Sequence, residues 1–176
     1  MSRKSSINKI KRSNAASKDI ESGLVMNLYQ KGHSPISTHA SICGLAECDV
    51  ISVSKSDFIY EYEVKISRGD FKKDFSKPKH TLITEGKFIT ERFKGEEKEI
   101  WYLVPNYFYF VVPENLVTIS EIPSYAGLIY VHTKNDILYY TIVKKAPIIH
   151  KTKASPNFIR AMAHQLSCKL VFKKVI

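Results

Sequence analysis

The chain has 176 residues, of which 44% are hydrophobic and 25% are charged, and its formal net charge is +10. This composition is that of one globular domain, and no apolar run approaches the roughly 20 residues that a membrane-spanning helix needs. We therefore expect a cytoplasmic protein without a secretory signal or membrane span, whose cysteines Cys43, Cys48 and Cys168 form no disulfide.

Much of the positive charge lies at the N-terminus. Six basic residues and no acid occur between Arg3 and Lys18, and subtracting these six from the total of 27 leaves 21 basic against 17 acidic residues elsewhere. Residues 1–16 are expected to form a basic disordered tail, either a solvated end or an arm that binds nucleic acid. A single domain is expected over residues 17–176.

The first ordered element is expected to be a helix that begins near Ser17. Ile20, Leu24 and Leu28 recur at helical spacing, and Gly32 supplies a stop. The pattern from Ile36 to Ser67 is then typical of strands.

A short basic helix is expected next. Asp70 can cap it, and Pro78 ends it after about Ser76. The polar stretch 81–100 is expected to be an inserted hairpin or loop.

The C-terminal half returns to apolar segments. Tyr107–Val112 predicts a strand that is buried on both faces. Ala126–Val131 and Ile137–Val143 predict a hairpin, and Ser155 predicts the N-cap of a last helix that reaches about Lys169.

The pairing register of the two strands on either side of residue 56 predicts which charged side chains lie close together. A turn at Lys55–Asp57 places Asp49 opposite Glu63, with Cβ atoms about 4.5–5.5 Å apart. Two carboxylates at that distance repel each other by about 3 kcal/mol at an effective dielectric constant of about 20. A divalent cation would compensate this repulsion. Lys65, two positions beyond Glu63, is expected on the same face.

Structural alternatives stay open at this point. An acid two residues before a lysine also occurs at Asp70, Glu85 and Glu96. The same register opposes Glu47 to Lys65, which could form a surface ion pair worth well under about 1 kcal/mol. A slip of one residue would place the two strand acids on opposite faces.

The segments around these residues resemble a known family. Two segments resemble the core of the PD-(D/E)XK nucleases, particularly that of the MmcB-like group of DNA-repair-associated proteins. The first is Cys48-Asp49-Val50-Ile51, and the second is Glu61-Tyr62-Glu63-Val64-Lys65-Ile66-Ser67-Arg68-Gly69-Asp70-Phe71. Segments 106–113, 122–123 and 126–129 resemble the later strands of that group in order and spacing.

The resemblance covers about residues 17–131. It implies an α/β fold of the restriction-endonuclease type, with a mixed sheet flanked by helices and an αβββαβ core. The chain departs from the family at two points. Cys48 stands where the superfamily often has proline, and stretch 81–100 looks longer than the corresponding connection in the MmcB-like group.

The resemblance also implies a site. Asp49, Glu63 and Lys65 would be catalytic, and Mg²⁺, with Mn²⁺ as a substitute, would be held by Asp49, Glu63 and the Val64 carbonyl. Glu21 is a further candidate ligand, because superfamily members often add an acid from the first helix. An acid in a first helical turn is also favoured by the helix dipole alone.

The implied function is that of a Mg²⁺-dependent deoxyribonuclease in DNA repair, recombination or processing. Alternatives are an inactive DNA-binding or scaffold module of the same fold and an RNA-directed nuclease. DNA is the expected partner, and association into a homodimer is an open alternative to a monomer. Five basic residues after the motif are candidates for phosphate contacts, with a solvated helix face as the alternative: Arg68, Lys72, Lys73, Lys77 and Lys79. His80 shows no metal-ligand spacing and is expected to be a surface or core residue.

Overall fold

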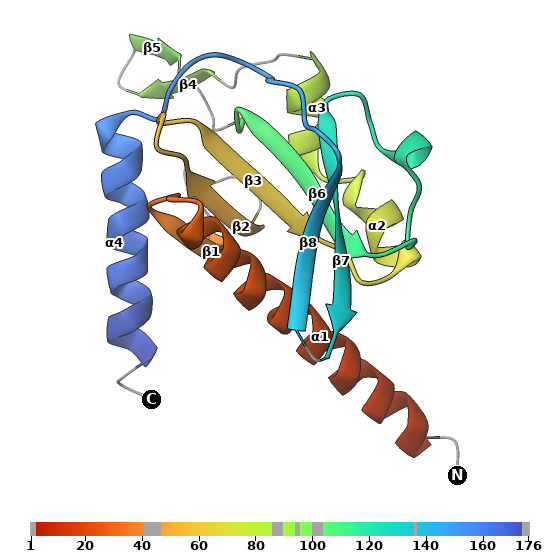
Figure 1. The fold of residues 1–176 in the computed structure, drawn as a ribbon. Helices are drawn as coiled ribbons and strands as arrows, with labels where there is room; N and C mark the ends of the chain where they lie inside the picture. Colours follow the sequence, from red (N-terminus) through yellow and green to blue (C-terminus); the bar gives the residue numbers. More distant parts are fainter. Residues whose placement is uncertain are drawn as a thin grey trace.

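The computed structural model describes the backbone of residues 3–40, 47–85, 90–93, 96–99, 104–135 and 137–173, and the side chains within 17–40, 47–84, 104–135 and 137–172. Its centre is a six-stranded sheet in the order β1-β2-β3-β6-β7-β8 (Figure 1). β3 pairs in parallel with β6 and β6 with β7, whereas the other neighbours are antiparallel. The strands are Ile36–Ala40 (β1), Cys48–Val53 (β2), Ile59–Val64 (β3), Tyr107–Pro113 (β6), Ala126–Lys134 (β7) and Ile137–Lys144 (β8).

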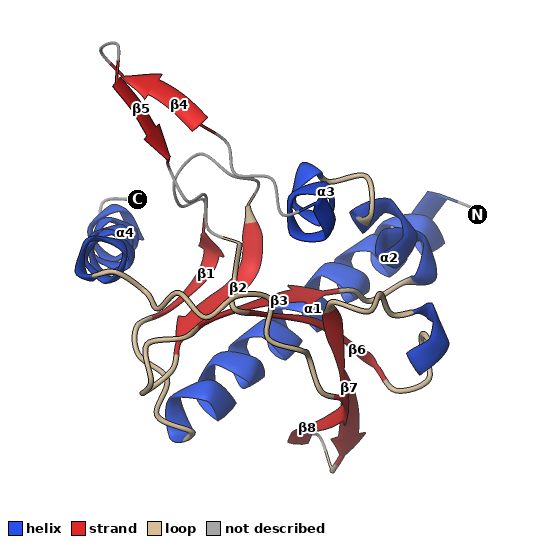
Figure 2. Cartoon of the chain, turned by 90° about the horizontal axis from the view of Figure 1, so that it is seen from above, coloured by secondary structure: helices blue, strands red, loops and turns tan. Residues whose placement is uncertain are grey.

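Helices flank this mixed sheet on both faces. α1 lies on one face, and α2 and α3 lie on the other (Figure 2). The bounds are Arg3–Gln30 (α1), Arg68–Asp74 (α2), Pro78–Glu85 (α3) and Pro156–Lys173 (α4), with a 3₁₀ turn at Ile119–Glu121. The predicted class, α/β with a mixed sheet between helices, is confirmed. None of the described helices has an apolar stretch of the length that a bilayer crossing requires.

Helix α1 buries the predicted apolar stripe. Ile20, Leu24 and Leu28 are 6%, 1% and 3% exposed and pack on the sheet. Gly32 follows the helix with a positive φ of 82°, which is the conformation expected of a glycine stop. The helix begins at Arg3, whereas the sequence predicts order only from about Ser17.

The predicted register between β2 and β3 is confirmed. Val50 pairs with Tyr62 and Ile51 with Glu61, and one further step in this register brings Asp49 opposite Glu63. The tight turn at 55–57 fixes the register, since the amide of Ser54 donates to the Phe58 carbonyl at 2.9 Å. The one-residue slip is therefore excluded.

The connection between β3 and β6 differs in detail from its prediction. Ser67, rather than Asp70, caps α2, because the Ser67 Oγ accepts from the Asp70 amide at 3.1 Å. Asp70 lies in the first turn, where a carboxylate suits the helix dipole. Pro78 ends no helix but opens α3, as proline often does at a first helical position.

Within the predicted insertion, β4 (Thr90–Phe93) and β5 (Glu96–Glu99) form an antiparallel hairpin. This hairpin projects away from the main sheet (Figure 2). The start of the predicted insertion, residues 81–85, belongs to α3 instead.

The C-terminal elements follow the sequence prediction. β7 and β8 form the expected hairpin. The Ser155 Oγ accepts from the Phe158 amide at 3.2 Å, which is an N-cap contact. Phe158 and Met162 of α4 then pack against β2 and β3 near the β1 edge.

Candidate active site

The candidate site lies on the face of β3 that is turned away from α1. Glu61, Glu63 and Lys65 alternate along the strand and just beyond its end, and all three are buried. Tyr62 and Val64 point to the opposite face and join the apolar cluster under α1. The strand period of two therefore gathers charged side chains on a single buried face.

The three residues that carry the motif meet on this face. The Lys65 Nζ lies 2.5 Å from the Glu63 Oε2 and 3.7 Å from the Asp49 Oδ2. Asp49, near the start of β2, also accepts a hydrogen bond of 2.7 Å from the Val64 amide, which holds its carboxylate beside the end of β3. The expected grouping of two acids and one ammonium is thus present in the fold.

Glu63 is surrounded by ammonium groups. Its side chain is fully buried, its Oε1 accepts from Lys79, and its Oε2 accepts from Lys65 and from Lys77, the latter at 2.9 Å. Lys79 also contacts Glu61 at 2.6 Å. In this structure, lysines supply the positive charge that the sequence argument assigns to a divalent cation.

A fourth acid, Asp74 of α2, joins the cluster and was not predicted. Its side chain is 1% exposed, and its Oδ2 lies 2.8 Å from the His80 Nε2. The His80 Nδ1 lies 2.7 Å from the Tyr125 hydroxyl, so His80 is a core residue that links α2 to the start of β7. The only sequence signal for Asp74 is its helical spacing from Phe71, which is also buried.

The second oxygen of Asp74 has two positively charged partners. The Asp74 Oδ1 lies 2.9 Å from the Lys65 Nζ and 2.6 Å from the Lys77 Nζ. These ion pairs compensate the charge of a carboxylate that is buried beside β3.

The environment shifts the pKa values of the cluster acids in different directions. Burial and the nearby Glu63 carboxylate raise the pKa of Asp49 to about 6. Burial alone would also raise the pKa of Glu63, but the ammonium groups of Lys79 and Lys65 lower it below the usual value. The pKa of Asp74 is likewise lowered, since burial is outweighed by His80 and the neighbouring lysines. Glu63 and Asp74 are therefore charged at neutral pH.

The pKa values of two cluster lysines, Lys65 and Lys79, are raised. Burial opposes the charge of Lys65, but the carboxylates of Glu63 and Asp49 raise its pKa above the usual value. The pKa of Lys79 is raised for the same reason by Glu61 and Glu63. Burial outweighs the effect of Lys79 on Glu61, so the pKa of this acid is raised.

Glu21, the other predicted metal ligand, has different partners. Its buried carboxylate accepts from the Ser17 hydroxyl at 3.0 Å and contacts the His39 Nε2 at 2.8 Å. His39 also contacts Glu47 at 3.1 Å, so Glu47 has this imidazole as its partner in place of the Lys65 contact that one structural alternative expected. The acids that contact Lys65 are Asp49, Glu63 and Asp74.

The five basic residues proposed as phosphate contacts fall into three groups. Lys79 is 8% exposed and turned into the cluster, because the buried acids of β3 attract it inward, and its contact to phosphate stays a prediction. Lys77 is 32% exposed and lies at the cluster's edge. Arg68 is exposed but contacts Glu121 and the Leu116 carbonyl, while Lys72 and Lys73 are exposed on α2.

No three Asp, Glu, His or Cys side chains in the described part of the chain are arranged to hold a metal ion. At this site, ammonium groups contact the Glu63 and Asp74 oxygens. Mg²⁺ itself needs only one or two carboxylates, because it keeps several of its waters. The pair Asp49 and Glu63 is sufficient in number for such an ion.

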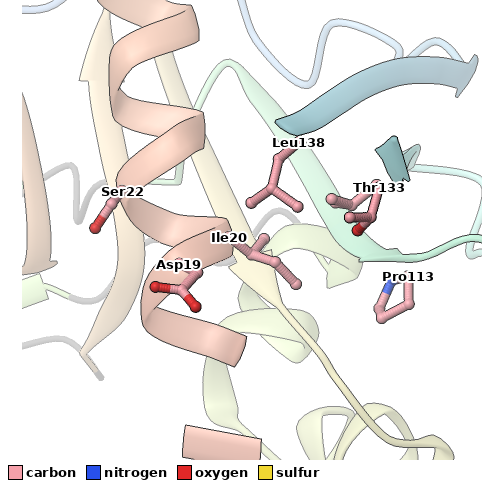
Figure 3. Close-up of a pocket in the computed structure, with 7 residues that line it drawn as sticks. Asp19, Ile20, Ser22, Pro113, Thr133 and Leu138 are labelled. Carbon is pink, nitrogen blue, oxygen red and sulfur yellow. The ribbon is translucent and has the colours of Figure 1, made fainter. Parts of the chain in front are cut away.

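A pocket of about 620 Å³ lies apart from the cluster, between α1 and the strands β6 to β8 (Figure 3). Ile20 and Leu138 contribute apolar surface, and Asp19 is the acidic residue in its lining. None of the acids that contact Lys65 lines this pocket. The convergent charged groups therefore make the cluster on β3 the better candidate for an active site.

Comparison with known proteins adds information on the fold. No family model matches the chain, and no curated protein matches it. Among solved structures, a protein of unknown function from Silicibacter pomeroyi is similar, with a TM-score of 0.55 and 19% identity over 84% of each chain. At this identity the likeness concerns the arrangement of the backbone, and the chain accordingly shares its α/β fold with that protein.

Proposed function

We propose that the protein is a Mg²⁺-dependent nuclease of the PD-(D/E)XK type that hydrolyses phosphodiester bonds in DNA. The observation that carries the proposal is the position of the Lys65 ammonium, 2.5 Å from Glu63 and 3.7 Å from Asp49. The order of elements, α1, then β1 to β3, then α2 and later β6, supports it, since it follows the αβββαβ arrangement that the family resemblance implies.

The charge of the cluster is compatible with a divalent cation. With every carboxyl group ionised, the four acids Asp49, Glu61, Glu63 and Asp74 face three ammonium groups, which leaves one formal negative charge. We propose that Asp49 and Glu63, with the Val64 carbonyl, hold the ion.

The bound ion would supply Lewis acidity and an activated water molecule. Lys65 would stabilise the negative charge that develops on the phosphoryl group during hydrolysis. The raised pKa of Lys65 favours this electrostatic role over proton abstraction, because the side chain stays protonated among its carboxylates. Lys72 and Lys73, exposed on α2, are the better candidates for contacts to the phosphate backbone.

A nuclease assay on the purified chain tests the proposal. Duplex, single-stranded and branched DNA, and RNA, are incubated with Mg²⁺, with Mn²⁺ or with a chelator. Metal-dependent cleavage of DNA is expected from the wild type and from D19N, which changes an exposed acid on α1. It should be lost in D49N, which changes the partly exposed acid of the cluster.

The other outcomes separate the alternatives. Binding of DNA without cleavage under every condition would contradict the proposal and favour an inactive DNA-binding module. Cleavage confined to RNA would favour the RNA-directed nuclease. Equal cleavage by wild type and D49N would mean that the activity comes from a contaminant or from another site.

A further inference from the structure

We propose that a pocket between α1 and the tyrosines of β3 and β6 binds a small molecule that carries a flat aromatic ring and an anionic group. This pocket lies on the α1 side of the sheet, whereas the charged cluster lies on the opposite side. Binding there would be separate from the proposed nuclease function, and neither depends on the other.

The pocket has a volume of about 220 Å³ and lies beside the C-terminal half of α1. Leu24 and Leu28 of the helix contribute to its lining, as do Ile129 of β7 and Ile142 of β8. Protein interiors are close-packed, and an apolar cavity of about 150 Å³ can admit benzene. The present pocket is therefore large enough for one ring or for two fused rings.

Tyrosine rings form the aromatic part of the lining. The rings of Tyr62 and Tyr109 stack with centroids 5.7 Å and planes 18° apart, and Tyr60 continues this layer at 6.3 Å and 15° from Tyr62. A fourth ring, that of Tyr140 on β8, is held against α1 because its hydroxyl donates to the Ile20 carbonyl at 2.7 Å. Such rings offer faces and edges to another flat ring, which favours an aromatic ligand over a saturated one.

Two hydroxyl groups of this lining are left for a ligand. The Tyr62 hydroxyl hydrogen bonds to Ser52, and that of Tyr140 hydrogen bonds to α1. Within the described residues, the hydroxyls of Tyr60 and Tyr109 have no hydrogen-bond partner, although the Tyr109 side chain is only 7% exposed. A hydroxyl on a buried side chain normally has a partner, and a polar group of the ligand would supply one.

The charged and polar residues of the lining favour an anion. Asn27, Lys31 and His33 lie at and just beyond the end of α1. The His33 Nδ1 lies 2.8 Å from the Ser52 Oγ. Burial and the Lys31 ammonium lower the pKa of His33, so this imidazole is neutral at neutral pH. The positive charge of the lining is then that of Lys31, and the described lining contains no acid.

The larger pocket in Figure 3 fits this class of ligand less well. Its described lining includes Asp19 and contains no aromatic ring. An anion would be repelled by this carboxylate, and a flat ring would find no aromatic surface there. The two pockets therefore provide an internal comparison for the experiment.

The test is a titration of the full chain, followed by the NMR signals of its isoleucine and leucine methyl groups. The first probe is 2-naphthoate, which has two fused rings and a carboxylate. Ring currents of the bound probe should shift the signals of Ile129 and Ile142 saturably, with a Kd at or below about 1 mM, as a ligand of this size permits. The signal of Leu138, in the other pocket, should not move.

Two analogues and two variants separate the ring from the charge. Decahydronaphthalene-2-carboxylate lacks the aromatic ring, 2-naphthamide lacks the charge, and both should bind more weakly than 2-naphthoate. K31M removes the ammonium of the lining, whereas the matched control K18M removes an exposed lysine of α1 outside the pocket. We expect K31M to bind 2-naphthoate about threefold more weakly, as for an exposed ion pair, and K18M to bind like the wild type.

A titration with adenosine monophosphate distinguishes two sources of this chemistry. Tighter binding of the nucleotide than of 2-naphthoate would assign the pocket to nucleotides, and weaker binding would assign it to aromatic carboxylic acids. D49N should bind either ligand like the wild type, so the nuclease proposal and the pocket are judged separately.

Contrary results are equally clear. No saturable shift with either anion would show that the pocket is only a gap in the packing. Shifts of Leu138 without shifts of Ile129 and Ile142 would place binding in the other pocket. Equal binding of the saturated analogue would refute recognition of the ring, and equal binding by K31M and the wild type would refute recognition of the anion.

Discussion

The two faces of strand β3 are both buried but are covered in different ways. Under α1, Tyr62 and Val64 pack among apolar and aromatic side chains, and the rings of Tyr62 and Tyr109 stack with centroids 5.7 Å apart. On the other face, Glu63 and Lys65 take part in a network of acids and lysines. One strand thus separates an apolar core from a charged interior.

This difference indicates what each face is for. Apolar packing stabilises a fold without further conditions, whereas buried ion pairs often stabilise it less than apolar side chains of the same size would. A protein that needed only stability could bury apolar residues at 61, 63 and 65 as it does at 62 and 64. The charged face is therefore the face that we expect to carry the nuclease function, and changes on the two faces should have separable effects.

Removal of Lys65 should have the largest effect. In K65M the carboxylates of Asp49, Glu63 and Asp74 lose a shared buried ammonium. Loss of one partner from a buried ion pair typically costs about 3–5 kcal/mol, so we expect a decrease of this order in the free energy of unfolding, together with loss of nuclease activity. Urea denaturation followed by circular dichroism measures the first quantity.

K72M is the control for this experiment, because an exposed lysine should change the free energy of unfolding by no more than about 0.5 kcal/mol. A K65M protein as stable as K72M would show that the charged face contributes nothing to folding. That result would contradict the proposal that the ion pairs of the charged face are needed for stability.

A change on the apolar face should come next in size. Leu24 of α1 is 1% exposed and packs in the cluster that contains Tyr62 and Val64. We expect L24A to lower the free energy of unfolding by about 3 kcal/mol through lost burial and the cavity that remains. Its affinity for Mn²⁺, measured on the folded protein, should stay at the wild-type value. A large loss of metal affinity in L24A would mean that the two faces are coupled.

The smallest expected effect is the change of metal affinity with pH. Burial and Glu63 raise the pKa of Asp49 to about 6, so protons compete with a metal for this carboxylate below that pH. Metal affinity should therefore be constant above pH 7 and should fall by about tenfold for each pH unit below 6, as expected for one competing proton. Titrations with Mn²⁺ at several pH values measure this, and the step should be absent from any residual binding by D49N.

The sequence predicted the strand register because local features determine it. The turn at 55–57 leaves few ways to pair β2 with β3, and alternation then places Asp49, Glu63 and Lys65 on a common face. The stripe of α1 and the cap of α4 are equally local, and both were predicted correctly. Patterns that depend on neighbouring residues were thus sufficient for the motif.

The rest of the site depends on contacts that no local pattern specifies. Asp74 and Lys79 reach the cluster only because α2 and α3 fold back over β3, and before that arrangement is known they look like ordinary charged residues of a basic segment. The same holds for Glu21, whose partner His39 comes from β1. The sequence therefore does not show which charged side chains are buried, although it shows where they lie along the chain.

The charged cluster also has a short span along the chain. Its acids and lysines all lie between Asp49 and Lys79, and the described hairpin of β4 and β5 begins only at Thr90. The candidate site is in this sense contained in one continuous stretch of the chain, and the hairpin follows it. Exchange of that hairpin for another turn would therefore leave every residue of the charged cluster in the sequence unchanged.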